Sequence, residues 1–308
     1  ARHRLNLTIR ANAPCRRIIF EGTKAVGVEC DSGDEIFVVE GDEILLTSGA
    51  MKSPQILMLS GVGPADHLKE FNIPVVRDLP GVGQNLRDHP LATAVYTAKG
   101  EAPDVDVPLI QVCTRYTSEG SHLKSDMIIS PTLMTSEHRP IQIEIDDDGN
   151  YLGLAAGIQL AVGSGELRLN SADPNDQPYL DYNYLQEEFD RDRLRKGIRK
   201  VVELESHPAI QALIIERITP TDEELSSDEK LDAWLLTNVG TSHHISCTCK
   251  MGPASDSMAV VDQYGKVHGL QNLRVVDASI MPDCIRANTN ATTIMIAEKI
   301  ADFVIEGK

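Results

Sequence analysis

The N-terminal part of the chain consists of short β-rich runs separated by turn signals. From Asn6 onward, runs of aliphatic and β-branched residues alternate with the turns EGT, SGD and EGD. This pattern is typical of a small β-meander. The last of these runs, residues 43–47, predicts a buried strand that ends at a Ser-Gly-Ala turn, and a helix is predicted over residues 53–59. A strand, a glycine turn and a helix in this order commonly contact nucleotides.

The pattern changes near residue 90. Residues 71–90 are rich in Gly and Pro and predict an extended loop without regular structure. Beyond this loop, short apolar runs rich in β-branched residues predict an antiparallel sheet. The candidate strands of this sheet are residues 92–97, 109–116, 126–129, 142–145 and 154–162.

The C-terminal half of the chain adds helices. Leu194, Ile198 and Val201 recur at helical spacing among charged residues. This spacing predicts an amphipathic helix with a solvated charged face. The further predicted elements are a helix over residues 228–236, a buried strand over 273–276 and a closing helix over 292–304.

Composition and charge exclude several classes of protein. The 308 residues have an ordinary hydrophobic content of 42% and a formal net charge of -17. Because this charge repels phosphate backbones and anionic lipid surfaces, nucleic acid is not an expected partner. No apolar run approaches the length needed to span a bilayer. We therefore expect a soluble protein without a membrane span, and we leave its oligomeric state open.

The cysteines indicate a cellular compartment and raise one alternative function. Six cysteines are scattered along the chain, without the density of a disulfide-stapled secreted domain. A cytoplasmic location is the simpler expectation. His243, His244, Cys247 and Cys249 crowd four potential metal ligands into seven residues. Zinc ligands are usually drawn from two segments, so we favour buried thiols here and expect no metal site, with metal binding as the alternative.

Four stretches resemble the glucose-methanol-choline (GMC) oxidoreductase family. GAMKSPQILMLSGVGPADHL at 49–68 is similar to the second signature of the family, and LPGVGQNLRDHP at 79–90 is similar to the loop that links its flavin and substrate domains. The other two stretches are SHHISCTCKMG at 242–252 and LRVVDASIMPDCIRANTNATTIMIAEKIAD at 273–302. All four occur in the family's order, which argues against coincidence.

The resemblance implies FAD-dependent oxidation of an alcohol, in which a base takes the hydroxyl proton and hydride passes to flavin N5. Matching the third stretch on its Thr-Cys-Lys-Met-Gly end puts His244 at the catalytic histidine of the family. The second catalytic position, a histidine or asparagine in the family, falls on Asn288. An imidazole suits the base because its ordinary pKa is about 6.5, and an amide can donate to a developing alkoxide. Without the resemblance, His244 would be a structural histidine and Asn288 a turn or cap residue.

The resemblance also implies contacts to FAD. Asp277 and Ala278 match positions near the flavin diphosphate and ribityl chain, and Cys15 matches a position whose backbone contacts the adenine. Asn290 and Thr293 match contacts to the isoalloxazine edge. A helix that begins there offers free amides to the negative N1–C2 edge of a reduced flavin. Without the resemblance, this stretch is a plain helix cap.

The implied fold is α/β, or α+β overall. We expect an incomplete FAD-binding domain built from residues 1–90 and 236–308, with the catalytic residues on the returning segment. Residues 91–235 are expected to form an antiparallel-sheet substrate domain with helices. The glycine-rich dinucleotide fingerprint of the family has no counterpart in this sequence. The chain is therefore expected to be a C-terminal portion of a longer family member.

The substrate and the electron acceptor stay open at this point. The stretch SCTCKMG is similar to the choline dehydrogenases of the family, so choline is one candidate among small-molecule alcohols. A quaternary ammonium group is usually held by an aromatic cage, whereas the chain has an aromatic content of only 4%. The sequence distinguishes neither oxidase from dehydrogenase nor one electron acceptor from another. The alternative to an enzyme is a non-catalytic chain that needs a partner to bind FAD.

Overall fold

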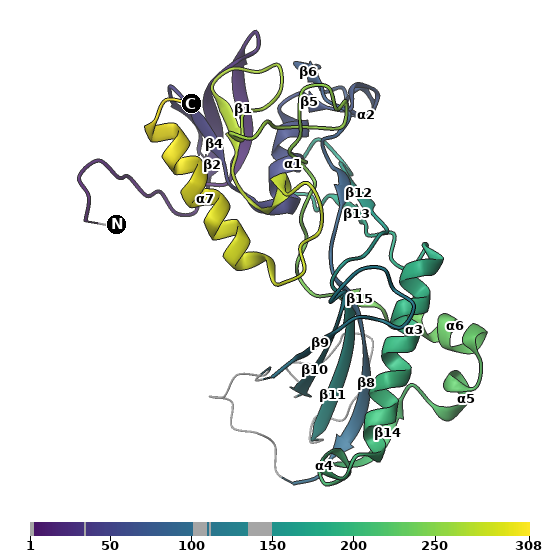
Figure 1. Cartoon of the computed structure of the whole chain (residues 1–308). Helices are drawn as coiled ribbons and strands as arrows, with labels where there is room; N and C mark the ends of the chain where they lie inside the picture. The colour runs from purple at the N-terminus through teal and green to yellow at the C-terminus, as the bar shows by residue number, and fades with distance from the viewer. Residues whose placement is uncertain (1–2, 34, 101–109, 111, 135–149) are drawn as a thin grey trace.

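The computed structural model describes residues 3–33, 35–100, 110, 112–134 and 150–308. These residues form two lobes (Figure 1). One lobe contains the C-terminal helix and the N-terminal strands, and the other contains a large sheet with helices beside it. The mixed α/β class and the antiparallel sheet expected from the sequence are confirmed.

The first lobe combines an antiparallel sheet with a parallel pair of strands. Its three-stranded sheet has the order β1-β2-β3, which confirms the predicted meander, although the first strand begins at Cys15. The parallel pair, β4 and β16, places the predicted strand near residue 45 beside the predicted strand near residue 274. The elements are β1 (Cys15–Glu21), β2 (Lys24–Ser32), β3 (Glu35–Glu40), β4 (Ile44–Leu46), α1 (Gly49–Leu59), β16 (Leu273–Val275), the 3₁₀ helix η2 (Ala278–Ile280) and α7 (Thr289–Ile305).

Helix α1 begins four residues before the predicted start at residue 53, and Pro54 lies inside it. Proline favours the first helical turn because it has no N–H for the carbonyl four residues earlier. In the structure, the Thr248 hydroxyl donates to that carbonyl, the oxygen of Ala50, at 2.6 Å. A long-range partner thus satisfies the acceptor that Pro54 leaves free, and the sequence around the helix gave no sign of it.

A small sheet with the order β13-β12-β7 lies between the two lobes, whereas β5, α2 and β6 belong to the first lobe (Figure 1). The Gly- and Pro-rich stretch 71–90, predicted to be an irregular loop, contains two short strands and the start of a third. Gly83 allows β7 to pair with β12: its φ is +83°, and a Cβ there would lie 2.2 Å from the carbonyl oxygen of Leu167. Its N–H donates to Thr248 O at 2.8 Å, and its carbonyl accepts from Leu167 N at 2.7 Å. The elements are β5 (Val62–Gly63), α2 (Ala65–Glu70), β6 (Arg77–Asp78), β7 (Gln84–Leu86), β12 (Gly165–Arg168) and β13 (Tyr179–Asp181).

The second lobe is built on a six-stranded sheet with the order β14-β8-β11-β10-β9, and β15 pairs with the start of β8. All pairings are antiparallel. The central strand β11 is buried along its whole length. It ends at residue 158 rather than 162, and the predicted strand 142–145 lies outside the described residues. The strands are β8 (Pro90–Ala98), β9 (Thr114–Tyr116), β10 (Met127–Met134), β11 (Tyr151–Ile158), β14 (Ile214–Thr219) and β15 (Gly240–Thr241).

Helix α3 packs on this sheet through the predicted apolar face. Leu194, Ile198 and Val201 are fully buried, which confirms the amphipathic helix. A Cβ at Gly197 would lie 3.0 Å from the Met127 side chain, so a glycine there allows the helix to approach the sheet closely. The helices of this lobe are α3 (Glu188–Glu203), the 3₁₀ helix η1 (Leu204–Ser206), α4 (Pro208–Gln211), α5 (Asp222–Leu225) and α6 (Asp228–Asn238).

Candidate active site

The two predicted catalytic residues lie next to each other. His244 follows β15 and is half-buried, whereas Asn288 immediately precedes α7 and is exposed. The amide nitrogen of Asn288 lies 3.1 Å from Nε2 of His244, which is hydrogen-bonding distance. In Figure 1, the end of α7 away from the C terminus points toward the second lobe. A helix start and a loop from the sheet thus meet at this imidazole.

A buried carboxylate fixes the backbone of His244. Asp88 is 3% exposed, and its Oδ1 accepts from the N–H groups of His244 at 2.9 Å and His89 at 2.7 Å. Its Oδ2 accepts from the Tyr184 hydroxyl at 2.5 Å and also from the Thr241 hydroxyl. Burial of the imidazole lowers the pKa of His244, and the charge of Asp88 partly opposes this effect. The net direction favours a neutral imidazole.

A second imidazole lies against the first. His89 is fully buried, and its Nδ1 lies 2.9 Å from Nδ1 of His244. The other nitrogen of His89, Nε2, lies 2.7 Å from the carbonyl oxygen of Ile285. The two rings meet edge to face, with centroids 4.9 Å apart. Burial lowers the pKa of His89 as well.

Asp88 and His89 are site residues that the sequence reasoning missed. Both belong to the stretch LPGVGQNLRDHP, which was interpreted only as a connection between domains. The available signal was the Asp-His pair itself, two side chains with acid–base chemistry at the end of a Gly-rich loop. Nothing in the sequence indicated that this loop would meet His244, some 155 residues further along.

The crowded cysteines are buried thiols. Cys247 and Cys249 are fully buried, and the Cys247 thiol donates to the Ser246 hydroxyl at 3.3 Å. Burial raises the pKa of Cys247 to about 12, so its thiol stays protonated. Among the described residues, the structure brings no three His, Cys, Asp or Glu side chains together in a group that could hold a metal ion.

The structure places Asp277 between two helix starts. Its Oδ2 accepts from Gly49 N at 3.0 Å and from the Ser53 hydroxyl at 2.5 Å, and its Oδ1 accepts from Ser279 N at 2.8 Å. Asp277 therefore caps α1 from a position more than 220 residues away in the chain. The carbonyl of the next residue, Ala278, accepts from Cys247 N at 3.1 Å. Asp277 and Ala278 thus connect the start of α1, which follows β4, to the segment that contains His244 and Cys247.

The start of α7 suits an electronegative group. No side chain in the described part of the chain caps this helix, and its first turn contains no acidic residue. Asn290 is exposed, and the Thr293 hydroxyl donates a hydrogen bond to the Thr289 carbonyl at 2.8 Å. The uncapped N–H groups and the positive dipole end of a 17-residue helix favour a negative or polar ligand edge. This is the chemistry expected for residues that contact the isoalloxazine edge.

Cys15 lies in a separate part of the first lobe. It is half-buried at the start of β1 and lines a cavity of about 330 Å³ together with Ser48, Lys52 and Gln55. Burial raises the pKa of the Cys15 thiol to about 11. The cavity borders the start of α1, which Asp277 caps.

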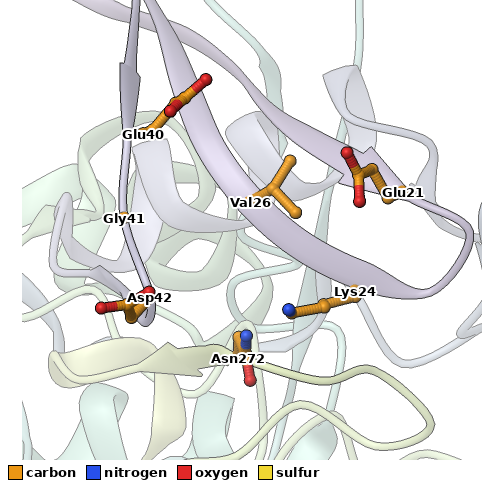
Figure 2. A pocket seen from close by; sticks show the side chains of 7 residues that line it. All are labelled: Glu21, Lys24, Val26, Glu40, Gly41, Asp42 and Asn272. Atoms are coloured by element: carbon orange, nitrogen blue, oxygen red, sulfur yellow. The ribbon is translucent and has the colours of Figure 1, made fainter.

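A second hollow, of about 410 Å³, lies over the N-terminal sheet (Figure 2). Figure 2 shows the amine of Lys24 near Asn272, with carboxylates at the margin. None of the predicted site residues lines it. The lining residues are Glu21, Lys24, Val26, Glu40, Gly41, Asp42 and Asn272.

Comparison with protein families identifies the chain. The family model for the N-terminal part of GMC oxidoreductases matches residues 1–91, and the model for their C-terminal part matches residues 161–297. Together the two matches cover well over half of the chain. The chain belongs to the GMC oxidoreductase family, as the four sequence stretches predicted.

Individual relatives agree with this assignment. The chain is 39% identical to an "Oxygen-dependent choline dehydrogenase" of Escherichia coli, and the match covers 100% of this chain and 59% of the relative. The crystal structure of a pyridoxine 4-oxidase from "Mesorbium loti" superposes with a TM-score of 0.88 at 28% identity, over 98% of this chain and 58% of that one. The chain therefore spans less than two thirds of the length of these relatives.

A third comparison supports the fold alone. A formate oxidase of Aspergillus oryzae, studied for its FAD modification, superposes with a TM-score of 0.89 at 23% identity, over 98% of this chain and 61% of that one. Family membership indicates FAD as the cofactor. Within the described residues, no helix has both the length and the apolar character needed to cross a membrane.

Proposed function

We propose that this protein oxidises an alcohol to an aldehyde or ketone with FAD as its cofactor, and that His244 and Asn288 act on the alcohol oxygen. One observation carries the proposal: the Asn288 amide lies 3.1 Å from Nε2 of His244, at the uncapped start of α7. A base and a hydrogen-bond donor for one oxygen atom thus lie beside a helix terminus suited to a flavin edge. Family membership supports the same reading.

The residues of this chain supply the proton chemistry. His244 is the base that takes the hydroxyl proton, and its lowered pKa keeps the imidazole neutral and able to accept. The Asn288 amide donates to the same oxygen as negative charge develops on it. FAD, when bound, accepts the hydride from the carbinol carbon. Both side chains start from backbone positions that α7 and Asp88 hold in place.

Five residues are proposed to hold the cofactor. Asp277 and Ala278, which order the turn before α1, would contact the diphosphate and ribityl chain, and Asn290 and Thr293 in the first turns of α7 would contact the ring edge. The cavity beside Cys15 is proposed for the adenine end. We also keep the expected division into residues 1–90, 91–235 and 236–308 as a proposal, with the substrate bound between the two lobes.

A choline-type alcohol is our candidate substrate, because the relatives at 39% identity carry the name choline dehydrogenase. A cytoplasmic location and an unidentified electron acceptor, which takes the electrons from the reduced flavin, complete this proposal. The second candidate function is a non-catalytic chain that needs a partner to bind FAD.

The test is stopped-flow reduction of the flavin-loaded protein by an alcohol, in the wild type and in His244→Asn. General bases contribute roughly 10²–10⁴-fold to rate. We expect the variant to bind FAD as the wild type does and to lose at least about 10²-fold in the rate at which the visible flavin band bleaches. Equal rates in both proteins would exclude His244 as the base.

His243→Asn is the matched control. This neighbour is an exposed histidine with a φ of +59°, a conformation that asparagine tolerates well. It should reduce flavin at nearly the wild-type rate, because its side chain is exposed and takes no part in the hydrogen bonds that join His89, His244 and Asn288. Titration of the wild type with FAD separates the second candidate, since a protein that takes up flavin only after a partner is added supports the non-catalytic chain.

A further inference from the structure

His89, His244 and Asn288 form a row of hydrogen bonds, and one backbone oxygen at its end determines which atom donates in each of them. The Ile285 carbonyl oxygen can only accept, and it lies 2.7 Å from Nε2 of His89. Nε2 of His89 must therefore carry a proton. In a neutral imidazole only one nitrogen is protonated, so Nδ1 of His89 is then an acceptor.

The direction continues into His244. Its Nδ1 lies 2.9 Å from the accepting Nδ1 of His89, so this nitrogen carries the proton of the second ring. Nε2 of His244 is left with its lone pair. That nitrogen faces the Asn288 amide at 3.1 Å, and the NH₂ group of the amide is a donor that this lone pair can accept. Every contact in the row has one donor and one acceptor.

The opposite direction requires a charged His89. If both nitrogens of His89 were protonated, its Nδ1 would donate to His244 and the proton of His244 would move to Nε2. His89 is fully buried, and burial disfavours a charged imidazole. The pKa of His89 is lowered chiefly by this burial, which agrees with a neutral ring.

We propose that His89 is a positioning residue that holds His244 in the tautomer with the proton on Nδ1 and the lone pair on Nε2. The proposal rests on the proposed function, in which Nε2 is the atom that accepts the hydroxyl proton. An imidazole protonated at Nε2 would present a donor to the alcohol instead of a base. In other enzymes, the partner of the distal ring nitrogen is known to set which nitrogen can act.

The test reads the tautomer directly in the full chain labelled with ¹⁵N-histidine. Two-bond ¹H–¹⁵N spectra distinguish a protonated ring nitrogen from one with a free lone pair. The chain has nine histidines, and spectra of the His89 and His244 variants assign the two signals. We expect Nδ1 of His244 and Nε2 of His89 to be protonated. A wild-type spectrum with the proton on Nε2 of His244 would overturn the proposal without any variant.

Two substitutions separate positioning from a structural role. His89→Phe keeps a ring but removes the acceptor, so His244 should no longer be restricted to the Nδ1–H tautomer. His89→Asn keeps an acceptor oxygen at about the place of Nδ1 and should preserve the tautomer. In flavin reduction we expect His89→Phe to lose at least about 10²-fold, within the contribution of a general base, and His89→Asn to recover much of it.

These readouts distinguish the failure of the proposal from the failure of the proposed function. The tautomer is measured without flavin or alcohol, so it holds or fails independently of any activity. An unchanged His244 tautomer in His89→Phe would refute the positioning role. A changed tautomer with an unchanged reduction rate would refute the role of Nε2 as the base instead.

Discussion

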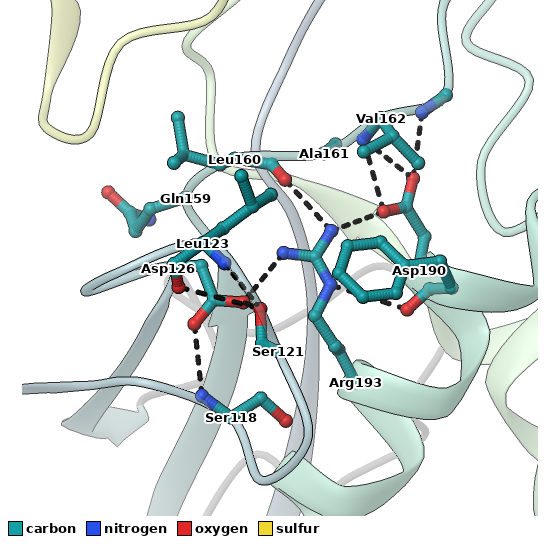
Figure 3. Close-up of polar contacts among 12 residues, drawn as sticks. Ser118, Ser121, Leu123, Asp126, Gln159, Leu160, Ala161, Val162, Asp190 and Arg193 are labelled. Atoms are coloured by element: carbon teal, nitrogen blue, oxygen red, sulfur yellow. Dashed lines mark hydrogen bonds and ion pairs between the residues drawn. The ribbon is translucent and has the colours of Figure 1, made fainter.

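Two buried polar networks of this chain differ in how they end. One lies in the second lobe, where Arg193, Asp126 and Asp190 are all at most 2% exposed (Figure 3). The Arg193 guanidinium contacts the two carboxylates, at 2.8 Å for Asp126, and donates to the Leu160 carbonyl at 2.8 Å. The other lies between the lobes and joins Asp88 and His89 to the half-buried ring of His244.

The Arg193 network is closed, in the sense that all its charged groups are buried and paired within the protein. Each carboxylate also accepts from its surroundings: Asp126 from Ser118 N at 3.0 Å and Ser121 at 2.6 Å, and Asp190 from the backbone of Val162 and Gly163. Burial alone would raise the pKa of Asp126, but the hydrogen bonds from Ser121 and Arg193 outweigh it and lower the pKa. The network fastens α3 to the loops at one end of the sheet.

The His244 network is open. Its inner end is as well satisfied as the first network, because the Asp88 carboxylate accepts four hydrogen bonds. Its outer end is an imidazole nitrogen whose partner, Asn288, is exposed. The comparison teaches that burial and full pairing alone do not indicate function. A network becomes a candidate for chemistry where it delivers a titratable atom to an accessible position.

The largest expected effect is on the closed network. Arg193→Met should lower the free energy of unfolding by about 3–5 kcal/mol, because it leaves two carboxylates buried without their cation. Urea denaturation monitored by circular dichroism measures this loss. The comparison also predicts that the pH profile of flavin reduction stays unchanged in any fraction that remains folded.

Arg199→Met is the control for this variant, since the residue lies on the same helix but is 42% exposed in its pair with Asp228. An exposed pair of this kind contributes about 0–1 kcal/mol. If Arg193→Met destabilised the protein no more than Arg199→Met does, the closed network would not be the fastening that its geometry suggests.

A smaller effect is expected from Asp88→Asn. The amide cannot accept at all four positions, so one or more donors around residue 88 loses a partner, at a cost of about 1–3 kcal/mol in unfolding free energy. The same substitution removes the charge that raises the pKa of His244. Flavin reduction should therefore persist to lower pH in the variant that remains folded than in the wild type.

Asp66→Asn is the matched control, because this carboxylate is 98% exposed in a surface pair with Lys69. It should change the unfolding free energy by no more than about 1 kcal/mol and leave the pH profile where it was. A pH profile that moves equally in both variants would show that Asp88 has no specific electrostatic effect on His244.

The sequence predicted the elements whose pattern is local. The apolar face of Leu194, Ile198 and Val201 predicted α3, and the strand runs of the second lobe predicted an antiparallel sheet. The four family stretches also led to His244 and Asn288, which lie in contact. These features could be recognised because each depends on residues close together in the chain or on a motif.

Long-range pairing is what the sequence did not reveal. The start of α1 depends on Thr248 and on Asp277, which lie about 200 and 228 residues further along. The loop strands within residues 71–90 exist because Gly83 lets the backbone approach Leu167 and Thr248. The contact between His89 and His244 is of the same kind, so the residue proposed to set the tautomer could not be singled out from local pattern.

The smallest expected effect is a shift in the pH profile of kcat/KM for the wild type, on the acid side where activity is lost. Burial and the nearby His243 lower the pKa of His244, whereas Asp88 raises it, and the net direction is down. Because the neutral ring is the base, a lowered pKa extends activity toward acid. The acid limb of kcat/KM for flavin-linked alcohol oxidation, which reports the free enzyme, should then fall below the ordinary histidine value of about 6.5. A limb above that value would mean that the charged imidazole is favoured, and the open network would then resemble the closed one in stabilising charge.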